Sequence, residues 1–171
     1  DNLIEWRDDG NPDYWRTFLA FWRFGPESKL VAPEIGELWR LLPADTRTPD
    51  HSIWSHLDMV SALAGAMHDG DRPALVAVSF GPVQGFIAQG RSISDLWAGS
   101  HLLSSLAWEG MRTVCESLGP DAILFPQLRG VAIVDRWFYQ QVEGGRRQAW
   151  RERFQSIGAS FLEKETDANP L

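Results

Sequence analysis

The sequence predicts an α+β fold, with a helical N-terminal portion at residues 1–72 and a second domain at residues 73–171 that opens with a strand. In the first portion, apolar residues recur at helical spacing. By contrast, Ala74–Phe80 is a short apolar run with β-branched residues, bounded by Pro73 and Gly81, which is typical of a buried strand. A helical pattern follows directly after it.

Three helical segments are expected in the N-terminal portion. Aromatic residues at near-helical spacing predict a helix over Tyr14–Phe24, ended by Gly25-Pro26. A turn or two of helix follows Pro33 and stops at Pro43. Ser52 can cap a third helix over Ile53–Met67. Its apolar residues are spaced to form one buried stripe: Ile53, Leu57, Val60, Ala64 and Met67.

The second portion alternates helices with shorter irregular segments. Pro82 suits the first position of a short helix with Val83, Phe86 and Ile87 on its apolar face. A longer helix is expected from Ile93 or Leu96 to Leu118, closed by Gly119-Pro120. The remaining predictions are a second strand at Asp121–Phe125, a loop or irregular hairpin at Pro126–Asp135, and a basic helix that begins near Gly144.

The composition is that of a globular protein with a packed core, at 44% hydrophobic and 23% charged residues among 171. Nine tryptophans predict broad contact surfaces, inside the fold or against partner subunits. The net charge of -7 argues against a general basic surface that grips nucleic acid, because phosphate contacts need clustered Lys and Arg. Any contact with RNA must therefore be local.

The single cysteine, Cys115, excludes an internal disulfide and a cysteine-based zinc site within this chain. The sequence starts without a signal region, and no apolar stretch approaches the length of a membrane span. We therefore expect a cytoplasmic location and no membrane partner. Because Asp1 stands where an initiator Met is usual, we also expect an internal segment of a longer protein.

Histidine and aspartate residues supply the first candidate site. Five of them lie within fourteen residues and could bind a divalent metal that activates water: Asp45, Asp50, His51, His56 and Asp58. However, His56 and Asp58 are two apart on a predicted helix and cannot point the same way. The alternative interpretation is structural, with Asp50 as a helix cap, Asp45 in an Asx-turn and His56 an ordinary helix residue.

A second candidate is the dipeptide His68-Asp69, which matches that of HD-type metal hydrolases. Those enzymes need the pair on a helix with further His and Asp ligands, whereas Gly70-Asp71-Arg72-Pro73 marks a helix exit here. A helix end is the alternative interpretation.

A third candidate is the turn after the predicted strand, together with Gly99-Ser100 in the long helix. A glycine at a strand end allows close backbone approach, and N–H groups at helix starts attract phosphate. The sequence contains neither a Walker loop nor the Gly-x-Gly-x-x-Gly fingerprint at this point. The alternative is a tight turn at Gly81 and close helix packing at Gly99. No Ser-His-Asp or Cys-His arrangement is evident.

Several strings, in order from Leu42 to Trp137, carry a family resemblance. They are Leu42–Arg47, Pro49–Trp54 with His56, Ser79–Gln89, Asp95–Ser100 with Leu103-Ser104, Asp121–Pro126, Leu128–Gly130 and Asp135–Trp137. Together they resemble the large, polymerase-like subunit of type III-B CRISPR (Cmr-type) RNA-guided effector complexes. The resemblance covers the end of its permuted HD-like region, here residues 1–72, and the start of its first palm domain, here residues 73–171.

The resemblance implies part of a ferredoxin-like, cyclase-related palm. In the family, this palm and a second one bind two ATP molecules with divalent metal and make cyclic oligoadenylates when target RNA is bound. The catalytic Gly-Gly-Asp-Asp motif of the second palm is missing from this sequence, as are the zinc-binding cysteines. Whether the chain is itself an enzyme therefore stays open. The implied role is subunit scaffold and one wall of the ATP site in antiviral defence, with other effector subunits, CRISPR RNA, target RNA and ATP as partners.

By similarity, Gly81, Gln84 and Ser100 face a bound nucleotide, and His56 lies on the closing helix of the HD-like nuclease, where one His joins the metal site. No catalytic residue is assigned. The stretch Gly90–Ser94 is less basic than is usual in the family, which weakens any phosphate contact there. Two alternatives stay open: a free-standing HD-like metal-dependent phosphohydrolase that uses His51, His56, His68 and Asp69, and a purely structural protein-protein interaction module.

Overall fold

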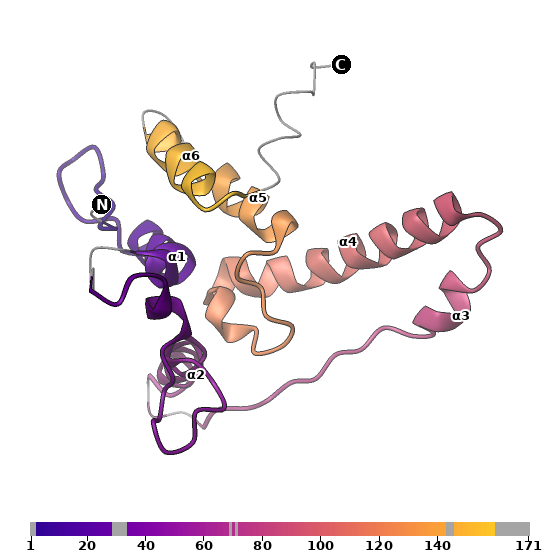
Figure 1. The fold of residues 1–171 in the computed structure, drawn as a ribbon, viewed down its shortest axis with the longest axis horizontal. Helices are drawn as coiled ribbons and strands as arrows, with labels where there is room; N and C mark the ends of the chain where they lie inside the picture. Colours follow the sequence, from indigo (N-terminus) through magenta and orange to yellow (C-terminus); the bar gives the residue numbers. More distant parts are fainter. Residues whose placement is uncertain (1–2, 29–33, 69, 71, 143–145, 160–171) are drawn as a thin grey trace. The chain divides into compact units, whose positions relative to one another are not determined.

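The computed structural model describes residues 3–28, 34–68, 70, 72–142 and 146–159 (Figure 1). The chain divides into two compact units. Unit 1 consists of residues 1–59 and 124–171, and unit 2 of residues 60–123. Residues 124–159 of unit 1 pack with the N-terminal segment rather than with the residues directly before them. The predicted domains at 1–72 and 73–171 stay a prediction.

Helices make up most of both units. Unit 1 contains α1 (Tyr14–Phe24), η1 (Gly25–Glu27), η2 (Gly36–Leu41), the first half of α2 (Ile53–Ala66), α5 (Ala132–Gln140) and α6 (Arg146–Ser156). Unit 2 contains the rest of α2, α3 (Val83–Ile87), α4 (Ile93–Leu118) and η3 (Pro120–Ala122). The predictions of α1, α2, α4 and α6 are confirmed. Among the described residues, none of the helices combines the length and apolar character that a membrane crossing requires.

The core of unit 1 is aromatic and joins both of its sequence segments. Phe24 at the end of α1 packs edge-on against Trp150 and Phe154 of α6, with ring centroids 5.5 and 4.9 Å apart. Trp22 stacks on Phe138 of α5 at 5.4 Å. The aromatic spacing that predicts α1 therefore also supplies the residues that hold α5 and α6.

Two arginines connect the segments of unit 1 through buried or half-buried ion pairs. Arg23 Nη2 donates to Asp135 Oδ2 at 2.8 Å, and both side chains are almost fully buried. Arg129 Nη2 donates to Asp58 Oδ1 at 2.7 Å, while the same guanidinium lies 4.7 Å from the Trp22 ring centroid. A buried charge is tolerated only when it is paired, so these contacts fix which segments pack together.

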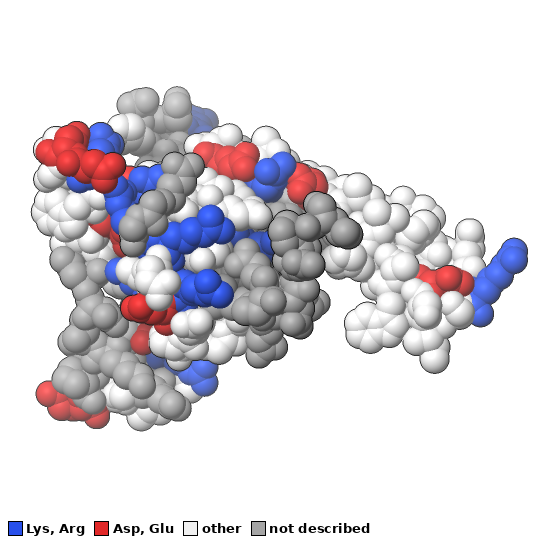
Figure 2. Space-filling model, turned by 90° about the horizontal axis from the view of Figure 1, so that it is seen from above, with Lys and Arg blue, Asp and Glu red and all other residues white. Residues whose placement is uncertain are grey.

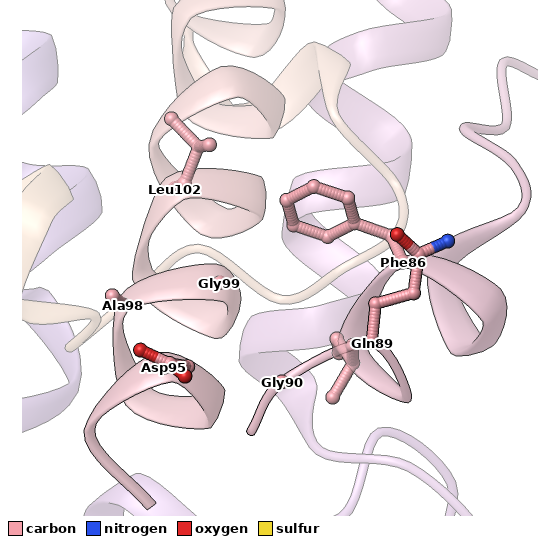
Figure 3. A pocket seen from close by; sticks show the side chains of 8 residues that line it. Phe86, Gln89, Gly90, Asp95, Ala98, Gly99 and Leu102 are labelled. Atoms are coloured by element: carbon pink, nitrogen blue, oxygen red, sulfur yellow. The ribbon is translucent and has the colours of Figure 1, made fainter. Parts of the chain in front are cut away.

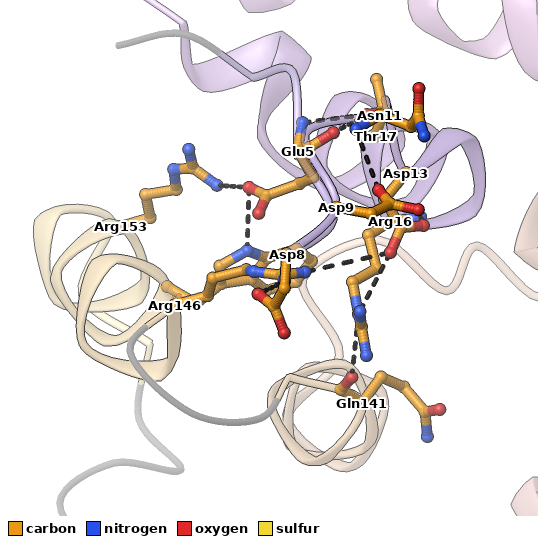
Figure 4. A network of polar contacts seen from close by, with 11 residues as sticks. Glu5, Asp8, Asp9, Asn11, Asp13, Arg16, Thr17, Gln141, Arg146 and Arg153 are labelled. Carbon is orange, nitrogen blue, oxygen red and sulfur yellow. Dashed lines mark hydrogen bonds and ion pairs between the residues drawn. The ribbon is translucent and has the colours of Figure 1, made fainter.

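The N-terminal segment is held against α6 by a second polar network (Figure 4). The carboxylate of Glu5 accepts hydrogen bonds from Trp150 Nε1 at 3.0 Å and Arg153 Nη1 at 2.7 Å. Asp8 pairs with Arg146 at 2.7 Å. Asp13 caps α1 by accepting from the backbone N–H of Arg16 at 3.1 Å. Unit 1 is thus closed by contacts between residues over a hundred positions apart.

The segment Ala74–Phe80 of unit 2 is extended but forms no sheet with any described residue. Leu75, Val76 and Val78 are 83%, 85% and 78% exposed, so the burial expected of an inner strand is absent from the chain as it stands. The bridges found in the described residues are isolated ones, Trp6 with Pro12 and Pro43 with Ser52. The predicted α+β class depends on partner strands and stays a prediction.

Three local predictions differ from the structure. The apolar stripe predicted for α2 is largely exposed at Leu57, Val60 and Met67, and Trp54 is the buried residue instead. The loop predicted up to Asp135 ends earlier, because α5 begins at Ala132 and buries Val134 and Trp137. The second predicted strand, 121–125, begins inside η3 and continues as unpaired chain.

Candidate functional site

A cleft of about 340 Å³ lies between α3 and α4 in unit 2 (Figure 3). Its walls are mainly apolar and come from both helices and the turn between them: Phe86, Ile87, Gln89, Gly90, Asp95, Ala98, Gly99 and Leu102. Residues 95, 98, 99 and 102 recur at helical spacing, so they form one face of α4. Figure 3 shows this face opposite the Phe86 ring.

Glycines in α4 and in the turn before it set the width of the cleft. A Cβ added at Gly99 would lie 3.4 Å from Cε1 of Phe86. At Gly90, an added Cβ would lie 3.1 Å from the side chain of Leu96 and 3.3 Å from the carbonyl oxygen of Ile87. A side chain at Gly90 would crowd the turn between α3 and α4, and one at Gly99 would fill the cleft. Glycine at these two positions therefore allows a tight turn and leaves the cleft open.

Asp95 is the charged residue that lines the cleft. Its Oδ2 accepts hydrogen bonds from the backbone N–H groups of Arg91 at 3.0 Å and Ser92 at 3.1 Å, and its own N–H donates to Ser92 Oγ at 3.1 Å. This reciprocal pair is a capping box that starts α4. A carboxylate is therefore fixed at the first turn of α4, where the helix dipole favours negative charge.

The cleft fits binding rather than bond-breaking chemistry. No nucleophile with an adjacent base occurs among its lining residues. Cys115 lies further along α4, and burial, reinforced by the charge of Asp121, raises the pKa of its thiol to about 12. That thiol stays protonated near neutral pH and is a poor nucleophile.

The three predicted nucleotide residues, Gly81, Gln84 and Ser100, are not among the residues that line the cleft. Gly81 and Gln84 lie at the start of α3 with exposed side-chain positions. Ser100 is exposed on α4, next to Gly99, and its carbonyl accepts from Ser104 Oγ at 2.9 Å. Nothing lies within 4 Å of a Cβ built on Gly81, so close packing does not require glycine there. Their assignment to a nucleotide stays a prediction.

The predicted metal candidates separate into two groups. Asp45 accepts from the backbone N–H and the guanidinium of Arg47, both at 2.8 Å, and the hydrogen bond from the guanidinium lowers the pKa of its carboxyl. The Asx-turn expected at Asp45 is therefore confirmed. Asp58 pairs with Arg129. Both carboxylates are thus committed to arginines.

The second group is the histidine pair near the start of α2. His51 Nδ1 lies 2.5 Å from Asp50 Oδ1, and this hydrogen bond lowers the pKa of the Asp50 carboxyl. The rings of His51 and His56 are 6.0 Å apart. Within the described residues, no group of three or more His, Cys, Asp or Glu side chains is arranged to hold a metal. His68 lies in the turn after α2, and Asp69 lies outside the described residues.

Sequence reasoning identified Gly99 and the apolar face of α3 but missed Asp95 as part of a site. Two signals pointed to it. The spacing Ser92-x-x-Asp95 before an apolar run is a capping-box pattern, and residues 95, 98, 99 and 102 share a helix face.

The comparison with protein families covers this hairpin. A family model described as "CRISPR-associated protein Cmr2, N-terminal" matches residues 75–166, which is more than half of the chain. The chain belongs to this Cmr2 N-terminal family. The match includes α3, α4, α5 and α6, and it confirms the Cmr-type resemblance read from the sequence.

Two curated relatives match as well. The chain is 45% identical over 98 residues to a CRISPR system Cmr subunit Cmr2 of Pyrococcus furiosus, which covers 57% of this chain and 11% of the relative. It is 38% identical over 90 residues to a CRISPR system CMR subunit Cmr2 of Saccharolobus solfataricus, covering 51% of this chain and 9% of the relative. The chain thus spans about a tenth of the length of these relatives. No solved structure matches it.

Proposed function

We propose that this Cmr2-family chain acts in antiviral defence as a scaffold segment and one wall of an ATP-binding site in a type III-B CRISPR effector complex. The parent subunit would assemble with other effector subunits, CRISPR RNA and target RNA. It would make cyclic oligoadenylates with ATP and divalent metal, using the Gly-Gly-Asp-Asp motif of a second palm. His56 would add one metal ligand to an HD-like nuclease site whose other ligands come from elsewhere in the parent.

The observation that carries the proposal is the position of the cleft within the family match. The Cmr2 N-terminal match at residues 75–166 contains all eight residues that line the cleft. An apolar, concave surface with few polar groups is the usual character of a small-molecule site. The absence of a nucleophile from its lining residues favours the role of a binding wall.

Unpartnered apolar surface supports the assignment to part of a palm. The backbone of Ala74–Phe80 is extended (Figure 1), and its N–H and C=O groups pair with no strand among the described residues, so a strand from elsewhere could pair with them. On α4, Ile93, Trp97 and Leu118 are each more than 70% exposed. A sheet formed with other parts of the parent subunit would cover both surfaces.

The residues of the cleft fit the base of a nucleotide better than its phosphates. Phe86, Ala98 and Leu102 offer an apolar surface for a flat ring, and the Asp95 carboxylate can accept a hydrogen bond from an amino group. None of the lining residues is basic. Backbone and hydroxyl groups of Gly81, Gln84 and Ser100 would then meet the sugar or phosphates.

The test is ATP binding by the chain with the second palm supplied in trans. Gly99→Leu would place a side chain against Phe86 and fill the cleft, so we expect at least about tenfold weaker ATP binding by calorimetry. Gly110→Leu is the matched control on the same helix, since nothing lies within 4 Å of its Cβ position.

The alternatives predict other results. If the wild-type chain shows no binding at millimolar ATP, it is a structural interaction module. If Gly99→Leu and Gly110→Leu bind ATP equally well, the nucleotide lies elsewhere. Stoichiometric bound metal that is lost in His56→Ala would instead support the metal phosphohydrolase.

A further inference from the structure

The arginines on the two edges of α6 differ in whether they form ion pairs with described residues. On one edge, Arg146 pairs with Asp8 and Arg153 pairs with Glu5, each at 2.7 Å. On the other edge, Arg147 and Arg151 are one helical turn apart, and neither forms an ion pair with a carboxylate among the described residues. Among the described residues, acidic side chains pair with the arginines of the first edge and not with those of the second.

Tyr139 of α5 holds one of the unneutralised guanidinium groups in place. The Arg147 guanidinium carbon lies 4.7 Å from the centroid of the Tyr139 ring. Stacking on an aromatic face orients the planar fork but leaves its N–H edges free to donate. Arg136 precedes Tyr139 by three residues on α5, so it lies on the same side of that helix, and its side chain is exposed.

Of the two acidic residues of α5 and α6, Asp135 is committed to an ion pair, whereas Glu152 is exposed and bonds the neutral amide of Gln148. Asp135 is buried and binds Arg23. The Glu152 carboxylate accepts a hydrogen bond from Gln148 at 2.9 Å. Figure 2 shows blue and red side chains intermingled on one face of the molecule. In a chain of net charge -7, such arginines mark a local anion-binding surface.

We propose that Arg136, Arg147 and Arg151, the α5–α6 arginine face, bind the phosphate backbone of RNA. A guanidinium donates two parallel hydrogen bonds to phosphate oxygens, and arginines one turn apart, about 6 Å along the helix, can contact separate phosphates. Such contacts position RNA without reading its sequence. The choice of RNA rests on the proposed function. It also satisfies the condition set by the acidic composition that any RNA contact be local.

The test is fluorescence anisotropy of an unstructured, labelled single-stranded RNA titrated with the full chain over a range of salt concentrations. Arg147→Gln combined with Arg151→Gln should weaken binding at low salt by about tenfold or more, and should reduce the slope of log affinity against log salt by about 1.4, or 0.7 per lost phosphate contact. Arg147→Lys combined with Arg151→Lys should restore the salt slope but only part of the affinity.

The matched control is Arg40→Gln combined with Arg72→Gln, which removes the same charge from exposed arginines that form no ion pair with described carboxylates. At about 0.15 M salt, where the Debye length is about 8 Å, we expect less than about a twofold change in affinity for this control. Equal loss in both double variants would overturn the proposal, since binding would then follow net charge. Unfolding curves followed by tryptophan fluorescence identify any variant that has lost its fold.

Two further results would also overturn it. Wild-type chain that does not bind RNA at low salt has no such face. If polyglutamate of equal length displaces the RNA as well as unlabelled RNA does, the face recognises acidic protein. The experiment contains no ATP, so failure here leaves the ATP test unaffected, and failure of ATP binding leaves this result unaffected.

Discussion

Unit 1 and unit 2 differ in how far their side chains are paired within the unit. In unit 1, charged and aromatic residues from distant parts of the sequence pair with one another, as Arg23 does with Asp135 and Phe24 with Trp150. In unit 2, large apolar residues such as Trp97 and Val76 are exposed. The difference indicates that unit 1 has an aromatic core of its own, whereas unit 2 leaves much of the apolar surface of its helices and of Ala74–Phe80 uncovered.

The strongest test of this contrast is to separate the units. Asp58 and Arg129 are in contact at 2.7 Å, so the two segments of unit 1 approach each other near the point where unit 2 leaves. A flexible Gly/Ser linker of about ten residues, with an end-to-end distance of roughly 17 to 19 Å, should replace residues 67–123 without strain. We expect this shortened chain to unfold cooperatively in urea, and residues 60–123 alone to show no cooperative transition.

The outcome is read from tryptophan fluorescence and far-ultraviolet circular dichroism, which should change together at one urea concentration. A shortened chain without a cooperative transition would show that unit 1 needs unit 2 to fold, and the contrast between them would fail.

The next largest effect is expected at the buried ion pair of unit 1. Asp135→Asn removes the charge that neutralises Arg23, and leaving a buried charge unpaired costs about 3 to 5 kcal/mol of the free energy of unfolding. Glu152→Gln is the control, because Glu152 is exposed and should change stability by no more than about 0.5 kcal/mol. Urea denaturation measures both. A loss below about 1 kcal/mol for Asp135→Asn would mean that water reaches the pair.

The same contrast explains which features could be predicted from sequence. Apolar spacing and glycine or proline stops predicted α1, α2, α4 and α6, because helix periodicity is a local signal. The pairing of Arg23 with Asp135 spans 112 positions, and no local pattern announces it. The α2 stripe was predicted to be buried, but spacing identifies an apolar face and not what covers it.

The site shows the same limit. Gly99 and the α3 face were visible as local features, and Asp95 could have been found from its capping spacing. The strand predicted at Ala74–Phe80 is extended but unpaired, since its pairing depends on strands that the described residues do not provide. Local propensity is thus sufficient for the elements, whereas burial and pairing depend on distant or separate chain segments.

The smallest effect is expected from a glycine-to-alanine substitution made once in each unit. A Cβ at Gly25 would lie 2.9 Å from Cζ3 of Trp54, whose Nε1 is held by the carbonyl of Trp39 at 3.2 Å. Because the ring cannot move freely, Gly25→Ala should destabilise the chain by about 1 to 3 kcal/mol through overpacking.

In α4 of unit 2, nothing lies within 4 Å of a Cβ at Gly110, so Gly110→Ala should stabilise the helix by about 0.5 to 1 kcal/mol through reduced backbone entropy of the unfolded chain. Urea midpoints should therefore move in opposite directions for the same chemical change. If both substitutions were stabilising, the Gly25 site would have room to relax, and the tight packing assigned to unit 1 would be wrong.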